Sequence, residues 1–206
     1  MRYPIPARRH RVEETIQRSR FITTVAHAPS AADARAFIDQ IKAEFPDATH
    51  NCWAFAAGPP ADTAQVGMGD EGEPHGTAGR PMLNVLHHGG VGEIAAVVTR
   101  YYGGVKLGKG GLVRAYSSGV QHALEGLPTV EKVDRSPVEI VVEYGALEGL
   151  RRLLTELEAP IEGEVFGETV VLRVQVPQGN LGALEEGLAD LTRGAGSITS
   201  MEGETE

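Results

Sequence analysis

The chain has 206 residues, of which 41% are hydrophobic and 23% are charged, a size that allows one large or two small globular domains. It contains no apolar run of the roughly 20 residues that a membrane-spanning helix needs, and its start, MRYPIPARRHRVEE, lacks the apolar stretch of a signal peptide. Because Cys52 is the single cysteine, an intramolecular disulfide framework is excluded, and we expect a cytosolic protein with no membrane partner.

The formal net charge of -9 is unevenly divided along the chain. Residues 1–130 contain 13 Lys and Arg against 12 Asp and Glu, a net of +1, whereas residues 131–206 contain 6 against 16, a net of -10. This step predicts two domains with different partners, 1–130 and 131–206. The acidic domain is a poor candidate for a nucleic-acid surface, and we expect it to contact a basic protein.

Hydrophobic periodicity and breaker residues predict the elements of the first domain. In chain order these are strands at 12–19 and 20–28, a helix from Ser30, a strand at 48–57, a long loop at 58–79 and a short helix from Pro81. Asp33 follows Ser30 by three residues, which fits a capping box at the start of the first helix. Cys52 is expected to be a core residue of its strand rather than a nucleophile paired with His50.

The segment RYYGGVKLGKGGLVRAYSS (100–118) lies in a window, 94–124, that contains no acid. The apolar run IAAVV (94–98) before it predicts a buried strand, and Leu112, Tyr116 and Val120 recur at helical spacing after it. A strand, a Gly-rich loop and the start of a helix form an anion site, because the first N–H groups of the helix are unpaired and its dipole favours negative charge. The candidate anion- or nucleic-acid-binding residues are Arg100, Tyr101, Tyr102, Gly103, Gly104, Lys106, Gly108, Lys109, Gly110, Gly111 and Arg114.

Three interpretations of this loop remain open. The stretch 103–110 fits the P-loop pattern G-x-x-x-x-G-K up to Lys109, but Gly110 stands where the Ser or Thr that binds magnesium should be. We favour the second interpretation, a loop that binds phosphate without a magnesium ion. The alternative without a ligand is a tight strand-to-helix turn with solvated lysines.

A second group of polar residues lies in the long loop, in DEGEPHGTAG (70–79). Its acids and histidine could hold a hard cation, form a solvated acidic turn, or face Arg100 or Lys109 and order both loops. The candidate loop-ordering or metal-binding residues are Asp70, Glu71, Glu73, His75 and Thr77. No cofactor is expected, and no catalytic residue is assigned.

The second domain alternates regularly between strands and helices. Strands are expected at 138–144, 161–166, 169–176 and 197–202, and helices at 147–157 and 181–191. The order βαββαβ is that of a ferredoxin-like fold.

Three segments resemble the IMPACT family, in its bacterial YigZ-like branch (uncharacterised protein family 0029): RSRFI (18–22), DEGEPHGTAGRPML (70–83) and VVTRYYGGVKLGKGGLVRAY (97–116). The resemblance covers essentially the whole chain and implies an α+β protein. It implies an N-terminal domain with the fold of the second domain of ribosomal protein S5 (S5 domain 2-like), followed by a ferredoxin-like domain that resembles domain V of elongation factor G. It carries no enzyme activity over to this chain.

Together, the basic loop and the resemblance favour a non-enzymatic, translation-associated module that binds RNA or ribosomal phosphate. Two alternatives belong to other classes of protein. One is an enzyme that acts on a phosphorylated small molecule or nucleotide, and the other is a protein-interaction regulator of the translation stress response.

Overall fold

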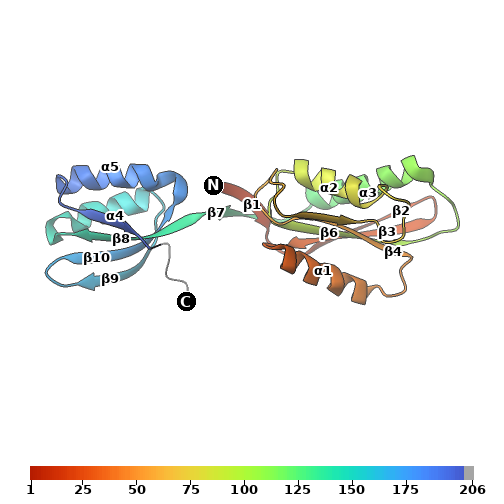
Figure 1. Cartoon of the computed structure of the whole chain (residues 1–206), viewed down its shortest axis with the longest axis horizontal. Coiled ribbons are helices and arrows are strands. Elements are labelled where there is room, and N and C mark those ends of the chain that lie inside the picture. The colour runs from red at the N-terminus through yellow and green to blue at the C-terminus, as the bar shows by residue number, and fades with distance from the viewer. Residues whose placement is uncertain (202–206) are drawn as a thin grey trace. The chain divides into compact units, whose positions relative to one another are not determined.

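The structure is a computed structural model that describes residues 1–201 and divides into two compact units (Figure 1). The first unit is Tyr3–Lys132, and the second joins Met1–Arg2 to the chain from Val133 onward. The expected two-domain α+β architecture is confirmed. In the described part of the chain, no helix is both long enough and apolar enough to cross a membrane.

A five-stranded antiparallel sheet runs through the first unit, in the order β2-β3-β6-β4-β5. Its strands are β2 (His10–Ile16), β3 (Ser19–His27), β4 (His50–Ala56), β5 (Val66–Gly69) and β6 (Ile94–Tyr101). Helix α1 covers one face, and helices α2 and α3 cover the other (Figure 1). These helices span Ala31–Glu44, Gly79–His88 and Gly108–Glu125.

Strand β6 is the central strand, and its alternation explains why it is apolar throughout. Ala96 and Val98 pack toward α2 and α3, whereas Ala95 and Val97 pack toward α1. Because both faces of the strand are covered, both sets of side chains must be apolar. Arg100 continues the alternation of Ala96 and Val98. Its side chain is therefore directed to the side of the sheet that α2 and α3 cover.

The predicted start of α1 is confirmed. Ser30 is the N-cap residue, and its Oγ accepts a hydrogen bond of 3.1 Å from the backbone N–H of Asp33. The cap satisfies one of the N–H groups that a helix start leaves without an intrahelical partner.

The predicted long loop at 58–79 is wrong in one respect, because it contains the short edge strand β5. This strand has the sequence VGMG, which carries no strand signal, since glycine is depleted in strands. Its glycines lie under the stacked rings of Phe55 and Trp53: a Cβ on Gly67 would come within 2.4 Å of Phe55, and one on Gly69 within 2.6 Å of Trp53. Only glycine leaves room for the two rings.

Two further strands, β1 (Arg2–Pro6) and β7 (Thr129–Val133), form a separate two-stranded sheet that the sequence did not indicate. Each is five residues long and carries a proline or exposed polar residues, so neither shows a clear alternation.

The second unit is a four-stranded antiparallel sheet in the order β11-β8-β10-β9, covered by two helices. Its elements are β8 (Arg135–Val142), α4 (Leu147–Glu156), β9 (Ile161–Phe166), β10 (Val170–Pro177), α5 (Leu181–Thr192) and β11 (Ser197–Ser200). Counted within the unit, the strand order is 4-1-3-2, so the expected ferredoxin-like arrangement is present. The prediction extended the last strand to Glu202, which lies outside the described residues.

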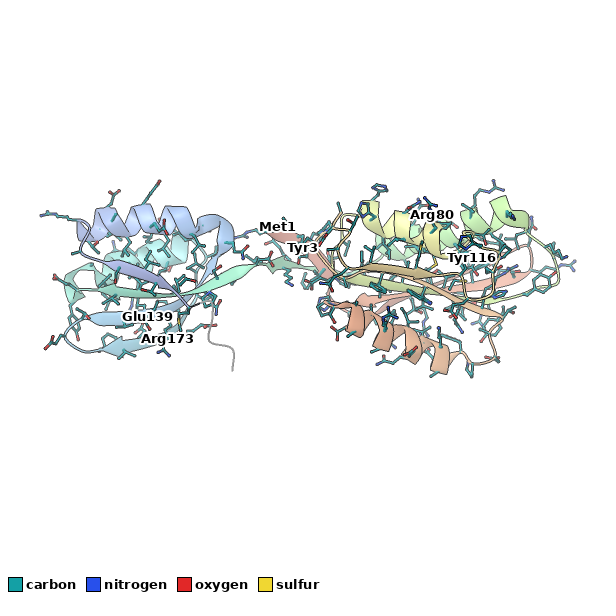
Figure 2. All side chains as sticks on the ribbon, in the orientation of Figure 1. Met1, Tyr3, Arg80, Tyr116, Glu139 and Arg173 are labelled. Carbon is teal, nitrogen blue, oxygen red and sulfur yellow. The ribbon has the colours of Figure 1, made fainter. Side chains whose placement is uncertain are left out.

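The sheet of the second unit has one face covered by α4 and α5 and one face that carries polar side chains. Leu150 and Leu188 from the helices pack against Ile140 of the sheet. On the other face Arg173 lies opposite Glu139 in the register of β10 and β8, with 3.5 Å between its Nε and a carboxylate oxygen (Figure 2).

Candidate anion-binding site

A cavity of about 490 Å³ lies in the first unit, where the acidic loop before α2 meets the Gly-rich loop between β6 and α3. It is lined by Thr49, His50, Glu73, Pro74, Arg100, Tyr102, Lys106, Leu107, Gly108, Lys109 and Leu112. The cavity therefore brings together residues from both groups that the sequence singled out.

A buried ion pair forms the floor of this cavity. Arg100 Nη1 donates to Glu73 Oε1 at 2.6 Å, and the two residues are only 5% and 8% exposed. Tyr116 Oη donates to the same oxygen at 2.8 Å, and Arg100 Nη2 donates to Ser19 Oγ at 3.3 Å. The sequence suggested Arg100 as a free cation for phosphate, but its charge is compensated by Glu73. This contact is the arrangement in which the acidic loop faces Arg100 and orders both loops.

Cys52 and Tyr116 are buried next to the ion pair, and neither acts as a nucleophile. Burial raises the pKa of the Cys52 thiol to about 12, and burial also raises the pKa of Tyr116. Cys52 Sγ donates to the carbonyl oxygen of Asp70 at 2.8 Å. A thiol that stays protonated at neutral pH is a poor nucleophile, so Cys52 has a structural role.

Asp70 holds the acidic loop onto the start of α2. Its carboxylate accepts hydrogen bonds from the backbone N–H groups of Gly76, Ala78 and Gly79 at 2.7, 3.0 and 2.8 Å. Burial acts to raise the pKa of Asp70, but these N–H groups outweigh it and hold the pKa below its usual range. Both carboxylate oxygens are thus occupied by the backbone.

The other candidate residues of the acidic loop are also engaged within the protein. Glu71 accepts from Trp53 Nε1 at 2.7 Å and pairs with Lys42 at 3.2 Å, and Thr77 Oγ1 donates to the Pro74 carbonyl at 2.6 Å. The fully exposed His75 ring lies 3.7 Å from Asp70. Among residues 1–201, no group of three or more His, Cys, Asp or Glu side chains is placed to hold a metal ion.

The Gly-rich loop leaves the N-terminus of α3 open to a ligand. The N-cap position is Leu107, which offers no side-chain hydrogen bond, and the first turn of the helix contains no acid. Lys106 and Lys109 are exposed at the cavity and have no carboxylate partner among the described residues. Backbone N–H groups without side-chain acceptors, beside two free ammonium groups, favour an anion.

The two adjacent tyrosines take different directions, as expected at a strand end. Tyr101 Oη donates to Asp47 at 2.9 Å, so this ring is engaged away from the cavity. Tyr102 is 45% exposed and lines the cavity, with Arg100 5.5 Å from its ring centre. Arg114 is exposed on α3 and is not part of the lining.

At the level of sequence, His50 was considered only as a partner of Cys52 and was not placed in the anion site, although one signal could have placed it there. His50 lies directly opposite Arg100 in the antiparallel register of β4 and β6, so any model that pairs these strands brings the two together. Its Nδ1 lies 2.9 Å from the Glu71 carbonyl, and its Nε2 lies 3.9 Å from Glu73 Oε1. A carbonyl oxygen only accepts, so Nδ1 of His50 donates this hydrogen bond.

Gly103 and Gly110 provide a direct test of which glycines the loop needs. A Cβ on Gly103 would lie 1.9 Å from the backbone oxygen of Arg18, whereas one on Gly110 would meet no atom within 4 Å. We expect Gly103→Ala to lower the free energy of unfolding by about 1–3 kcal/mol, because the backbone must shift. Gly110→Ala should raise it by about 0.5 kcal/mol, because alanine favours the helix. Urea denaturation measures both, and an equal effect of the two substitutions would contradict the close approach at Gly103.

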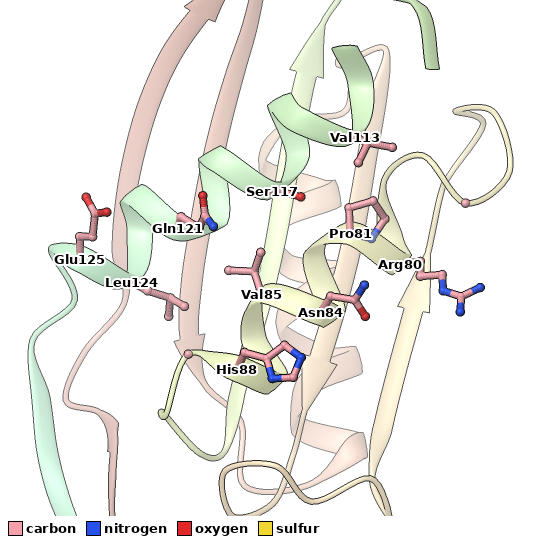
Figure 3. A pocket seen from close by; sticks show the side chains of 12 residues that line it. Arg80, Pro81, Asn84, Val85, His88, Val113, Ser117, Gln121, Leu124 and Glu125 are labelled. Atoms are coloured by element: carbon pink, nitrogen blue, oxygen red, sulfur yellow. The ribbon is translucent and has the colours of Figure 1, made fainter. Parts of the chain in front are cut away.

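A larger cavity, of about 940 Å³, lies between α2 and α3 (Figure 3). Pro81 and Val85 of α2 and Val113 and Leu124 of α3 contribute apolar walls, and polar side chains such as Asn84 are interspersed. It contains none of the side chains predicted to bind an anion, and the smaller cavity is therefore the better candidate site.

Comparisons with known proteins agree with the division into two units. Residues 17–124 match the model of the Impact N-terminal domain, and residues 140–195 match a domain of unknown function (DUF1949). The chain is 44% identical over 198 residues to the IMPACT family member YigZ of Escherichia coli, covering 96% of this chain and 97% of that protein. It is 35% identical over 190 residues to the IMPACT family member YvyE of Bacillus subtilis, covering 92% and 87%.

A solved structure also matches along the whole chain. It is described as a crystal structure of an hypothetical protein, is 44% identical, and aligns with a TM-score of 0.68 over 98% of both chains.

Proposed function

This chain belongs to the IMPACT family, and from that premise we propose that its first unit is a non-enzymatic module that binds RNA or ribosomal phosphate. Family membership supports a translation-associated regulatory role at the level of the family. The chemistry of the Gly-rich loop supports phosphate binding at that place.

The open start of α3 beside two unpaired lysines is the observation that carries the proposal. Helix N-termini bind phosphate because their N–H groups point outward and their dipole is positive at that end. Lys106 and Lys109 add two positive charges at the same place. The exposed ring of Tyr102 offers a surface on which a base can stack.

We expect the double variant Lys106→Ala/Lys109→Ala to weaken the binding of short single-stranded RNA. Each phosphate contact that is lost should reduce the slope of log K against log salt by about 0.7 for a single strand, or about 1.4 for two. The measurement is a filter-binding titration of the whole protein at several salt concentrations.

A matched control is Arg35→Ala/Arg152→Ala, which removes two positive charges at exposed positions outside the cavity. This control should leave the salt slope within error of the unchanged protein. An unaltered slope in the lysine variant would remove the loop from the binding site.

A further inference from the structure

We infer that the RNA site extends beyond the cavity, along a basic track that Lys106, Lys109, Arg114 and Arg18 form at one end of the first unit. The track takes the backbone of a single strand and makes about four phosphate contacts. The inference rests on the proposed function and adds the path and the length of the ligand.

The turn between β2 and β3 brings Arg18 to the Gly-rich loop. This turn consists of Gln17 and Arg18 alone. Ser19 Oγ accepts a hydrogen bond of 3.2 Å from the backbone N–H of Gly103, and a Cβ on Gly103 would lie 1.9 Å from the backbone oxygen of Arg18. The chain at Arg18 therefore lies directly against the Gly-rich loop.

The backbone of Arg18 is unusual for a residue with a side chain. Its φ is 68°, and that of Gln17 is 45°. A two-residue hairpin turn with positive φ at both positions strongly favours Asn-Gly. Residues with side chains are strained in this region, and strained positions concentrate at functional sites. The local backbone suits glycine better, so an arginine here points to a role for its side chain.

Helix α3 runs beside β2 and places Arg114 at the same end of the unit. A Cβ on Gly126 would lie 2.9 Å from the His10 ring, and Ser118 Oγ donates to Glu14 at 3.3 Å. The helix and the strand are therefore antiparallel. One helical turn before Ser118, Arg114 is level with the end of β2, where the turn begins.

The four side chains of the basic track are exposed, and none of them has a hydrogen bond or an ion pair within residues 1–201. Acids limit the length of the track. Further along α3, Glu14 faces His122 at 3.7 Å, and on the strands that flank the turn Glu13 pairs with Arg20 at 2.6 Å. A longer strand would pass beside these carboxylates and gain no further cation.

The cavity beside the track favours an unpaired base. The exposed ring of Tyr102 lines it, and Arg100 Nε, a buried donor of the same lining, has no hydrogen-bond partner among the described residues. Unstacked bases of RNA stack on aromatic rings and accept hydrogen bonds at their edges. A base held in a duplex is not free to stack on the ring, so the ligand is single-stranded.

The test compares two double variants, Arg18→Gly/Arg114→Ala and Lys106→Ala/Lys109→Ala, on a single-stranded twelve-nucleotide RNA and on a trinucleotide. Binding is followed by the fluorescence anisotropy of labelled RNA at several salt concentrations. For the longer RNA, the slope of log K against log salt should be about 2.8 in magnitude for four contacts, and each double variant should lower it by about 1.4. The trinucleotide has too few phosphates to reach the arginines from the cavity, so only the lysine variant should weaken its binding.

Two controls separate binding from folding. Arg35→Ala/Arg152→Ala should keep the slope of the unchanged protein. Glycine relieves the positive φ at position 18, so Arg18→Gly alone should raise the urea concentration at the midpoint of unfolding while it lowers the slope by about 0.7. An arginine with a structural role alone would change the midpoint and leave the slope as it is.

Three outcomes overturn the inference in distinguishable ways. If the lysine variant lowers the slope for the longer RNA and the arginine variant does not, the proposed function stands and the track is wrong. A duplex of the same length that binds as tightly as the single strand would overturn the single-stranded ligand. If neither variant changes the binding of any RNA, or if the unchanged protein binds none, the proposed function and the track both fail.

Discussion

Replacing Glu73 with alanine is expected to lower the free energy of unfolding of the first unit by about 3–5 kcal/mol. The substitution leaves the buried guanidinium of Arg100 without its carboxylate, and Tyr116 Oη loses the acceptor that it contacts at 2.8 Å. Trp53, the single tryptophan, lies in the first unit, so its fluorescence during urea denaturation reports on that unit.

The double variant Glu73→Leu/Arg100→Met separates the loss of the pair from the loss of packing. Removing both charges avoids an unpaired buried cation, so we expect it to recover most of the stability lost in Glu73→Ala. A cost below about 1 kcal/mol for Glu73→Ala would instead mean that water reaches Arg100 and screens the pair as it does on a protein surface.

Replacing Leu150 with alanine is expected to destabilise the second unit by about 2–5 kcal/mol and to leave the first unit unchanged. Leu150 is fully buried in the core of the second unit, and this core shares no residue with the two cores of the first. Scanning calorimetry should therefore show one transition moving to lower temperature while the midpoint followed by Trp53 fluorescence stays in place.

Met82→Ala is the matched control for this experiment, because Met82 is equally buried in the first unit. It should shift the Trp53 transition and spare the other one. If either substitution moves both transitions together, the units unfold as a single cooperative block, and the separation of their cores has no thermodynamic consequence.

Much of the fold could be predicted because local signals and tertiary packing agree. Ser30 marks the start of α1 through a hydrogen bond with the N–H of Asp33, only three residues further along the chain. The alternating strands and helices after residue 137 determine the ferredoxin-like order. Strand β5 could not be predicted, because its glycines are selected by the rings of Trp53 and Phe55 on a neighbouring strand and not by local preference.

The site could be predicted only in part, for the same physical reason. The spacing of glycines and lysines indicates an open helix start, which is a local property of the chain. Whether Arg100 is free or paired depends on Glu73, which is distant in sequence and reaches it through the folded loop. His50 enters the site through strand pairing alone, and a strand partner cannot be read from one segment.

The position of Cys52 makes it a built-in reporter of motion in the native state. The chain has no other cysteine, the thiol is fully buried, and its raised pKa keeps it unreactive while the unit is closed. A thiol reagent can therefore modify it only when the acidic loop lifts away or the first unit opens more widely. The labelling rate at rising urea concentrations would distinguish the two kinds of opening, because a local opening depends little on denaturant and global unfolding depends on it steeply. A ligand that bridges the two loops should slow the local reaction selectively, which gives a label-based binding assay that needs no knowledge of the ligand's chemistry.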